Sequence, residues 1–304
     1  MKYLFINSVY GFGSTGRLVA QTCERLKDEG HVCAAAYARA CVDNGAAQLI
    51  RIGTRADYLL HAGLTRLFDL NGYGSIIATH RLLSQIERFQ PDVVWLHNLH
   101  GYYLNVGILF RWLKARPHIK VYWTLHDCWA FTGHCAHFSA AKCERWRFGC
   151  GACPQLRAYP KTYGADWTRQ RFRHKQACFS GIEDMTVIVP SQWLAQLVRQ
   201  SFLGEYPVTV VHNQIDTEMF KPTPGDFRER YDLVGKYVVL GVASVWDEHK
   251  GLFDFCRLRE KLDDRFVIVL VGVTDAHSRP VLSRCRARRA LKNWPRSTAW
   301  QMCL

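Results

Sequence analysis

The chain has 304 residues, of which 48% are hydrophobic and 13% aromatic, and a formal net charge of +14. This length predicts about two domains of roughly 150 residues each. The apolar content is sufficient for buried cores and argues against a disordered chain. No apolar run approaches the roughly 18 residues that cross a bilayer. The short apolar start before Gly11 indicates a first strand and not a signal peptide.

The positive charge is unevenly distributed. Seven Lys or Arg residues and no Asp or Glu lie between His277 and Leu304, so this stretch supplies half of the net charge of +14. The remainder is small enough that we expect phosphate-bearing partners and not nucleic acid. Twelve Cys residues without a secretory signal indicate a reducing compartment, where clustered Cys residues bind metal or are simply buried.

The first part of the chain alternates apolar, strand-like segments with amphipathic segments of helix length, which predicts a parallel sheet with crossover helices. We expect strands at Tyr3–Asn7, Val32–Tyr37, Val93–Leu96, Val121–Leu125 and Thr186–Val189. We expect helices at Arg17–Glu29, Ile76–Phe89 and Val106–Lys114.

After Pro190 the same alternation starts again. It predicts a helix at Gln192–Ser201 and a helix near Leu252–Leu262, with strands at Val208–His212, Tyr237–Val242 and Phe266–Val271. We therefore expect two α/β domains with Rossmann-like parallel sheets, residues 1–190 and 191–276, the second incomplete, followed by an aberrant basic tail over 277–304. In such folds ligands bind where the carboxyl ends of the strands meet.

A glycine-rich segment, Gly11 to Gly16, matches the spacing G-x-G-x-x-G. It follows its strand too late for a dinucleotide fingerprint, and no acidic residue ends the second strand, so an NAD-dependent oxidoreductase is disfavoured. A loop that leads into a helix N-terminus still suits a phosphate, and a simple tight turn is the alternative. The candidate phosphate-binding residues are Gly13, Ser14, Thr15 and Gly16.

Polar side chains follow two of the expected strands. His97 and His100 come directly after Val93–Leu96, and His126-Asp127 follows Val121–Leu125. Both pairs should therefore lie at the carboxyl edge of the sheet, where imidazole and carboxylate groups can bind sugar hydroxyls or transfer a proton. A purely structural His–Asp pair is the alternative.

Four Cys residues follow this segment, within an expected Cys-rich insert over residues 128–160, in the spacing C-x7-C-x6-C-x2-C: Cys135, Cys143, Cys150 and Cys153. The closing C-x2-C has the spacing of a tetrahedral zinc site, and four thiolates would leave no position for chemistry. A structural zinc ion is one interpretation; reduced buried thiols and disulfides are the others.

The run from His126 through Gly133-His134-Cys135 to Gly149-Cys150-Gly151-Ala152-Cys153-Pro154 resembles bacterial exopolysaccharide glycosyltransferases, including those of the colanic-acid type, which are family-4-like GT-B enzymes. The segment from Asn213 to Phe220 resembles their interdomain connection, with Gln214 in place of the usual Gly. His249-Lys250-Gly251 resembles their Lys-Gly motif. The resemblance covers residues 1 to about 276.

This resemblance implies transfer of a sugar from a nucleotide-sugar donor to a lipid-linked saccharide, with retention of anomeric configuration and no cofactor in the chemistry. His126 would contact the sugar, Lys250 the donor diphosphate, and Asp127 and His97 the acceptor. The implied location is the cytoplasmic face of the inner membrane, as a peripheral protein. The alternative is a non-catalytic, truncated remnant that keeps only the acceptor-domain fold.

The last stretch departs from the family. Where family members continue into a helix with Tyr-x-x-Ala-Asp and two Glu residues, this chain is basic and aperiodic. From Lys292 onward, a shifted reading frame is compatible with Lys-Leu-Ala-Ala-Leu-Tyr-Ser-Met-Ala-Asp-Val-Phe, with four positions forced by the codons of Asn293 to Cys303. We therefore expect a frameshift; a disordered basic tail is the alternative.

Overall fold

The computed structural model describes residues 1–139, 141–243, 246 and 250–273 and divides the chain into two compact units, Met1–Gln214 and Ile215–Leu304. The tail expected over residues 277–304, and with it the frameshift hypothesis, lies outside the described residues. Within them, no helix is both long and apolar enough to cross a membrane.

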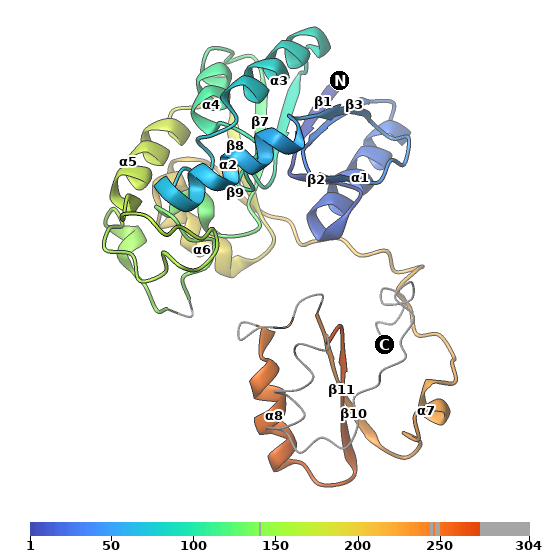
Figure 1. Ribbon diagram of the computed structural model, residues 1–304. Helices are drawn as coiled ribbons and strands as arrows, with labels where there is room; N and C mark the ends of the chain where they lie inside the picture. The colour runs from blue at the N-terminus through green and yellow to red at the C-terminus, as the bar shows by residue number, and fades with distance from the viewer. Residues whose placement is uncertain (140, 244–245, 247–249, 274–304) are drawn as a thin grey trace. The chain divides into compact units, whose positions relative to one another are not determined.

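The first unit is built on one seven-stranded parallel sheet (Figure 1). Its strands are β1 (Lys2–Ile6), β3 (Val32–Tyr37), β5 (Gln48–Arg51), β6 (Val93–Leu96), β7 (Lys120–Thr124), β8 (Met185–Val189) and β9 (Val208–Val210). They lie in the order β5-β3-β1-β6-β7-β8-β9, so the chain builds outward from β1 first in one direction and then in the other. A separate parallel pair joins β2 (Val9–Tyr10) to β4 (Ala40–Cys41).

Helices connect these strands. They are α1 (Gly13–Asp28), α2 (Arg55–Phe68), α3 (Ile76–Phe89), α4 (Val106–Lys114), α5 (Thr168–Phe179) and α6 (Gln192–Arg199). Short 3-10 turns form η1 (Trp129–Phe131), η2 (Arg145–Arg147) and η3 (Phe202–Glu205). Side-chain caps fix several helix starts: the Asn105 side chain accepts from Ile108 N at α4, and Thr54 forms a reciprocal capping box with Asp57 at α2.

The two faces of the sheet have separate cores, as the alternation of a strand requires. On β1, Leu4 and Ile6 belong to the large core that contains buried residues of α3, α4 and α6. Phe5, between them, belongs to the smaller core with Val19 and Cys23 of α1. Both cores are built mainly from aliphatic and aromatic side chains, which explains why the strands read as nearly continuous apolar runs.

Most expected elements of the first unit form with shifts of a few residues at their ends. Two differences affect the candidate site. The helix expected from Arg17 begins at Gly13, so the four candidate phosphate-binding residues form its first turn and not a loop before it. The expected domain boundary near residue 190 is also misplaced, since the first unit continues to Gln214.

The boundary is displaced because β9 completes the first sheet. β9 pairs with β8 in parallel register, with Val208 opposite Val187. The preceding α6 buries Leu194 and Val198 in the large core of the first unit. Strand pairing and apolar burial thus attach residues 191–210 to the first unit, although a new α/β alternation starts there in the sequence.

In the second unit, β10 (Tyr237–Val242) and β11 (Phe266–Val271) form a parallel pair in the register Tyr237 to Phe266. The helix between them, α8 (Leu252–Lys261), buries Leu252 and Cys256. A short helix, α7 (Phe227–Arg230), precedes β10. This β-α-β segment has the bounds expected from its sequence to within a residue.

Candidate functional site

The candidate site is placed by three neighbouring strands of the first sheet. β6 lies between β1 and β7, so the residues that follow these strands meet at one edge. The backbone N–H of His97 donates to the Ile6 carbonyl at the end of β1 (2.9 Å). A Cβ on Gly101 would lie 3.7 Å from Ser8 Cβ, which shows how closely the segments after β1 and β6 approach each other.

His97 and His126 form a direct pair at this edge. His97 Nδ1 lies 3.1 Å from His126 Nε2, and the two rings stack with centroids 5.4 Å apart and planes 16° from parallel. The Trp95 ring is also nearly parallel to that of His97, with centroids 6.2 Å apart and planes 18° from parallel. The Trp123 indole N–H donates to the His97 carbonyl (3.2 Å), so the backbone of His97 is fixed as well.

Burial keeps this pair neutral. Desolvation, reinforced by the neighbouring His126, holds the pKa of His97 well below its usual value. Desolvation also lowers the pKa of His126 to about 4, with Asp127 opposing the shift. Both imidazoles are therefore uncharged near pH 7. A neutral imidazole can donate one hydrogen bond and accept another, which matches a sugar hydroxyl.

Asp127, the residue after His126, is bound by His100. His100 Nε2 lies 2.7 Å from Asp127 Oδ2, and the Trp129 backbone N–H donates to Asp127 Oδ1 (2.9 Å). Burial alone would raise the pKa of Asp127, but His100 and the Trp129 hydrogen bond together hold it below the usual value. His100 Nδ1 is in turn 3.0 Å from the Tyr159 hydroxyl. The Asp127 carboxylate is thus ionised and oriented by named partners.

The glycine segment lies after β1 of the same sheet. Gly11 and Gly13 both have φ near +64°, and the Gly11 N–H donates to the Gly16 carbonyl (2.8 Å). A Cβ on Gly11 would lie 2.2 Å from the Val42 carbonyl oxygen, so only glycine fits there. Phe12, at the N-cap of α1, gives no side-chain cap, which leaves the first-turn N–H groups of Gly13 to Thr15 directed outward.

The residues of the sequence-based site belong to both units of the chain. Lys250 belongs to the second unit, directly before Gly251, the N-cap of α8 with φ of 72°. His97, His100, His126 and Asp127 come together as a contiguous group in the first unit.

The four cysteines of the insert share one small cavity. Cys135, Cys143, Cys150 and Cys153 all line a small cavity of about 10 Å³, together with Trp146. Two of the sulfurs already accept backbone hydrogen bonds, Cys150 from Gly133 N (3.2 Å) and Cys153 from Gln155 N (3.4 Å). In the part of the chain that the structure describes, no three His, Cys, Asp or Glu side chains are arranged around a common point as metal ligands.

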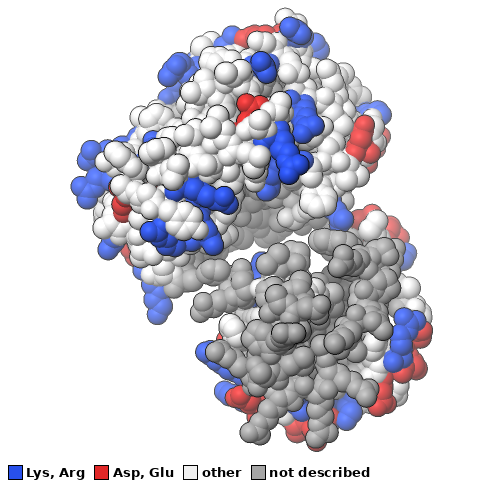
Figure 2. Space-filling model, viewed as in Figure 1, with Lys and Arg blue, Asp and Glu red and all other residues white. Residues whose placement is uncertain are grey.

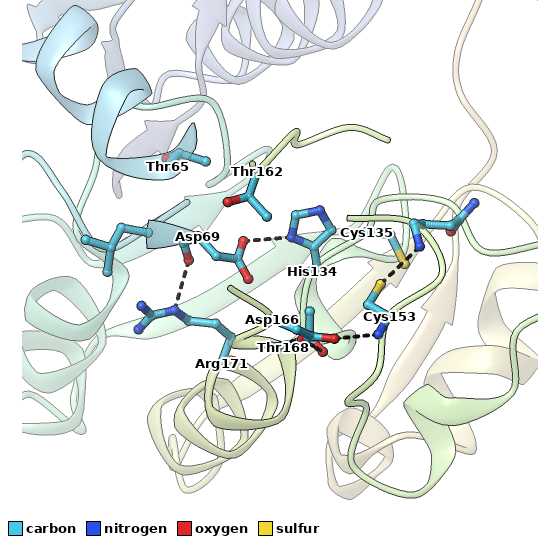
Figure 3. Close-up of polar contacts among 12 residues, drawn as sticks. Thr65, Asp69, His134, Cys135, Cys153, Thr162, Asp166, Thr168 and Arg171 are labelled. Atoms are coloured by element: carbon cyan, nitrogen blue, oxygen red, sulfur yellow. Dashed lines mark hydrogen bonds and ion pairs between the residues drawn. The ribbon is translucent and has the colours of Figure 1, made fainter. Parts of the chain in front are cut away.

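A buried network of polar contacts, which the sequence did not reveal, joins the insert to Asp69 and to α5 (Figure 3). His134 Nδ1 lies 2.7 Å from Asp69 Oδ1, and the two side chains are 0% and 2% exposed. Arg171 of α5 donates to the Asp69 carbonyl (2.9 Å). Lys175, also of α5, donates to the carbonyls of Trp129 (2.7 Å) and Thr132 (3.0 Å).

Lys175 holds the segment that follows His126-Asp127. Its ammonium lies 3.6 Å from the centre of the Trp129 ring, and burial lowers its pKa to about 7. α5 is thereby tied to η1, the turn that begins two residues after Asp127. A lysine in an otherwise polar helix carries no sequence signal for this role, and neither does Tyr159, which lies 59 positions from His100.

Known structures define the fold class. Sucrose-phosphate synthase from Thermosynechococcus elongatus has a TM-score of 0.59 at 13% identity, and the match covers 94% of this chain and 68% of that one. A glycosyltransferase from Rickettsia africae ESF-5 has a TM-score of 0.52 at 13% identity, with 94% and 65% covered. The chain therefore has the fold of the GT-B glycosyltransferases.

Sequence comparison then identifies the family. The model of Glycosyltransferase Family 4 matches residues 15–219, about two thirds of the chain, and the chain belongs to this family. A protein of Escherichia coli (strain K12) described as a colanic acid biosynthesis glycosyl transferase, WcaC, is 30% identical over 175 residues. That match covers 56% of this chain and 42% of WcaC, so it spans less than half the length of this relative.

Proposed function

We propose that this protein transfers a sugar from a nucleotide-sugar donor to a lipid-linked saccharide in exopolysaccharide biosynthesis, with retention of configuration. The observation that carries the proposal is the neutral His97–His126 pair at the carboxyl edge of a family-4 sheet. A solved structure described as "Trehalose-6-phosphate from E. coli bound with UDP-2-fluoro glucose" has a TM-score of 0.50 at 9% identity, which supports a nucleotide-sugar donor here.

We assign roles from the chemistry of each group. His126 would contact the donor sugar, since a neutral imidazole can bind a hydroxyl without a charge penalty. The first turn of α1, Gly13–Gly16, would bind a phosphate through its outward N–H groups, and Lys250 would supply a positive charge to the diphosphate. His97, His100 and Asp127 would position the acceptor and His126. No metal is required by these roles.

An assay of sugar transfer tests the proposal. The full chain is supplied with UDP- and GDP-hexoses and a lipid-linked saccharide, and released nucleoside diphosphate is measured. His126→Ala should lower kcat by about 10²-fold or more, in the range lost with a positioned acid–base or hydroxyl-binding group. His118→Ala, which removes an exposed histidine, should leave kcat unchanged.

Two results would contradict the proposal in different ways. Acceptor binding without turnover of any donor would favour the non-catalytic remnant. Binding of NAD with no response to nucleotide sugars would instead support an oxidoreductase and remove the assignment of the glycine segment to the donor phosphate.

We further propose that the four insert cysteines bind a structural zinc ion. The shared cavity and the two N–H···S hydrogen bonds support this, because thiolates that bind a metal are commonly oriented by such donors. The remaining thiols would close on the ion by side-chain rotation, and the ion would brace the insert between η1 and α5.

Metal analysis of the purified protein should find about one zinc per chain, lost in Cys150→Ser/Cys153→Ser and retained in Cys178→Ser, which changes a free cysteine outside the cavity. Cobalt substitution should give a thiolate charge-transfer band. A protein without zinc after growth in zinc-supplemented medium would end this proposal, and a mass lower by two protons would indicate a disulfide.

A further inference from the structure

The polarity of α2 is reversed relative to an ordinary surface helix. Leu59, Leu60, Leu67 and Phe68 are 59%, 66%, 59% and 51% exposed, and we call this set the α2 face. The side of α2 that packs inward instead carries His61, Ala62 and Thr65, all buried. A helix of a soluble domain normally buries its apolar stripe and exposes its polar one.

Specific hydrogen bonds hold this orientation. The buried His61 ring lies 2.8 Å from Ser75 Oγ through Nδ1 and 3.0 Å from the Leu70 carbonyl through Nε2. The Thr65 hydroxyl donates to the His61 carbonyl (2.9 Å). A Cβ on Gly74 would lie 2.5 Å from His61 Cγ, so glycine is required for the loop to close over this ring. Rotation of α2 to bury its leucines would break these contacts, and the α2 face is therefore a fixed feature.

Further exposed apolar side chains lie on segments that contact α2. Ile76 and Ile77 follow Ser75, the partner of His61, and are more than half exposed. At the other end, the Tyr163 N–H donates to the Arg66 carbonyl (2.7 Å), which places the exposed Tyr163 beside Leu67 and Phe68. A group of exposed apolar side chains of this kind commonly marks an interaction site.

The charges around the α2 face are almost entirely positive. Arg55 and Arg66 on α2, and Arg157 and Lys161 on the segment packed against its end, are exposed. None of the four takes part in an ion pair within residues 1–139, 141–243, 246 and 250–273.

The nearby acids are already engaged. Between residues 44 and 86 the sequence contains only Asp57, which forms the capping box with Thr54, and Asp69, which is paired with His134. Figure 2 shows the side of the first unit on which α2 lies in Figure 1 as uncharged surface between groups of Lys and Arg, with few acids.

We propose that the α2 face docks the protein onto an anionic lipid surface. Exposed leucine and aromatic side chains beside unpaired Arg and Lys are what an interfacial helix presents to headgroups and acyl chains. A second copy of this chain fits less well, because a two-fold interface would bring like charges of the same rim together. The proposal deepens the proposed function, since a lipid-linked acceptor would be presented at such a surface.

Vesicle co-sedimentation of the full chain tests the proposal independently of catalysis. Vesicles of phosphatidylcholine alone are compared with vesicles containing phosphatidylglycerol at the same total lipid. Leu60→Glu/Leu67→Glu places two acids on the α2 face at exposed positions that should not disturb folding. Trp193→Glu/Val32→Glu changes two apolar residues elsewhere in the first unit that are 53% and 54% exposed, and it serves as the matched control. Circular dichroism checks that both variants fold.

The wild type should bind the anionic vesicles, and binding should fall by at least about tenfold in the α2 variant and less than about twofold in the control. Raising the salt from 0.1 to 1 M should also weaken binding, because the electrostatic screening length shortens from about 10 to about 3 Å.

Equal binding of wild type and α2 variant would overturn the proposal. A wild-type dimer that the α2 variant converts to a monomer, without vesicle binding, would overturn it in favour of a second copy. Sugar transfer to a soluble acceptor, measured in parallel, shows whether the proposed function fails separately.

Discussion

Two polar clusters of the first unit differ in which parts of the fold they join. In the buried network, His134 is paired with Asp69, and Lys175 donates to two carbonyls, although Asp69 Oδ2 and His134 Nε2 have no partner within the described structure. At the sheet edge, His97 and His126 contact each other through one nitrogen each, and His97 Nε2 likewise has no partner among the described residues. The first cluster ties α5 to the segment after Asp127 and has the features of a support, whereas the second lies at the carboxyl edge of the sheet, where ligands bind in such folds.

The largest expected effect comes from removing Asp69 from the buried network. Asp69→Ala should lower the free energy of unfolding by about 3 kcal/mol or more, because it leaves the fully buried His134 without its partner. Urea denaturation at pH 7.5 measures the change. Asp28→Ala, which removes an exposed carboxylate at the end of α1, should change stability by less than about 0.5 kcal/mol. A loss from Asp69→Ala as small as that of the control would mean that the ion pair contributes nothing to the fold.

The second effect concerns acid pH and the edge cluster. The pKa of His126 is about 4 in the folded protein against an unfolded value of 6.5, so the unfolded chain takes up a proton that the folded protein refuses. Stability should therefore fall as pH drops from 6.5 to 4, by on the order of 3 kcal/mol from this residue alone. His97 acts in the same direction.

Chemical denaturation at pH 7 and pH 4.5 compares the wild type with His126→Asn. The variant should lose clearly less stability between these two pH values, while His118→Asn, at an exposed position, should follow the wild type. Parallel pH curves for the wild type and His126→Asn would show that His126 is not held neutral by burial.

The smallest expected effect tests whether the His100–Asp127 pair acts as a structural support or belongs to the ligand site. Tyr159→Phe removes the hydroxyl 3.0 Å from His100 Nδ1, and because Tyr159 is about half exposed, water can replace it. The unfolding free energy should fall by about 1 kcal/mol or less. Tyr163→Phe, also exposed, is the control. A loss of unfolding free energy several times larger would show that the His100–Asp127 pair acts as a structural support.

The sequence predicted the sheet well because its parallel strands are buried on both faces and appear as apolar runs. Val32–Tyr37 and Val93–Leu96 have the expected bounds. α2 could not be predicted from a core-facing stripe, because its leucines point outward. α5 was missed because it buries only Phe172 and Phe179 as large apolar residues among many charges.

The candidate site was predictable only where it depends on strand ends. His97 and His126 follow neighbouring strands, so their proximity follows from sheet order. Three further residues contribute through partners that are far away in the sequence: Tyr159, Asp69 and Lys175. Their contacts depend on the fold of the insert, and no local sequence pattern encodes such long-range pairing. The roles of Lys250 and of the glycine segment in donor binding stay predictions.

The attachment of β9 to the first sheet has a practical consequence for preparing this domain in isolation. A fragment ending near residue 190 would remove α6 and β9 and leave β8 as an unpaired edge whose apolar residues Val187 and Val189 are otherwise fully buried. Such an exposed edge is a template for intermolecular pairing, and we expect that fragment to aggregate. A fragment ending after Gln214 keeps the three-residue β9 as the natural end of the sheet, and we expect it to stay monodisperse.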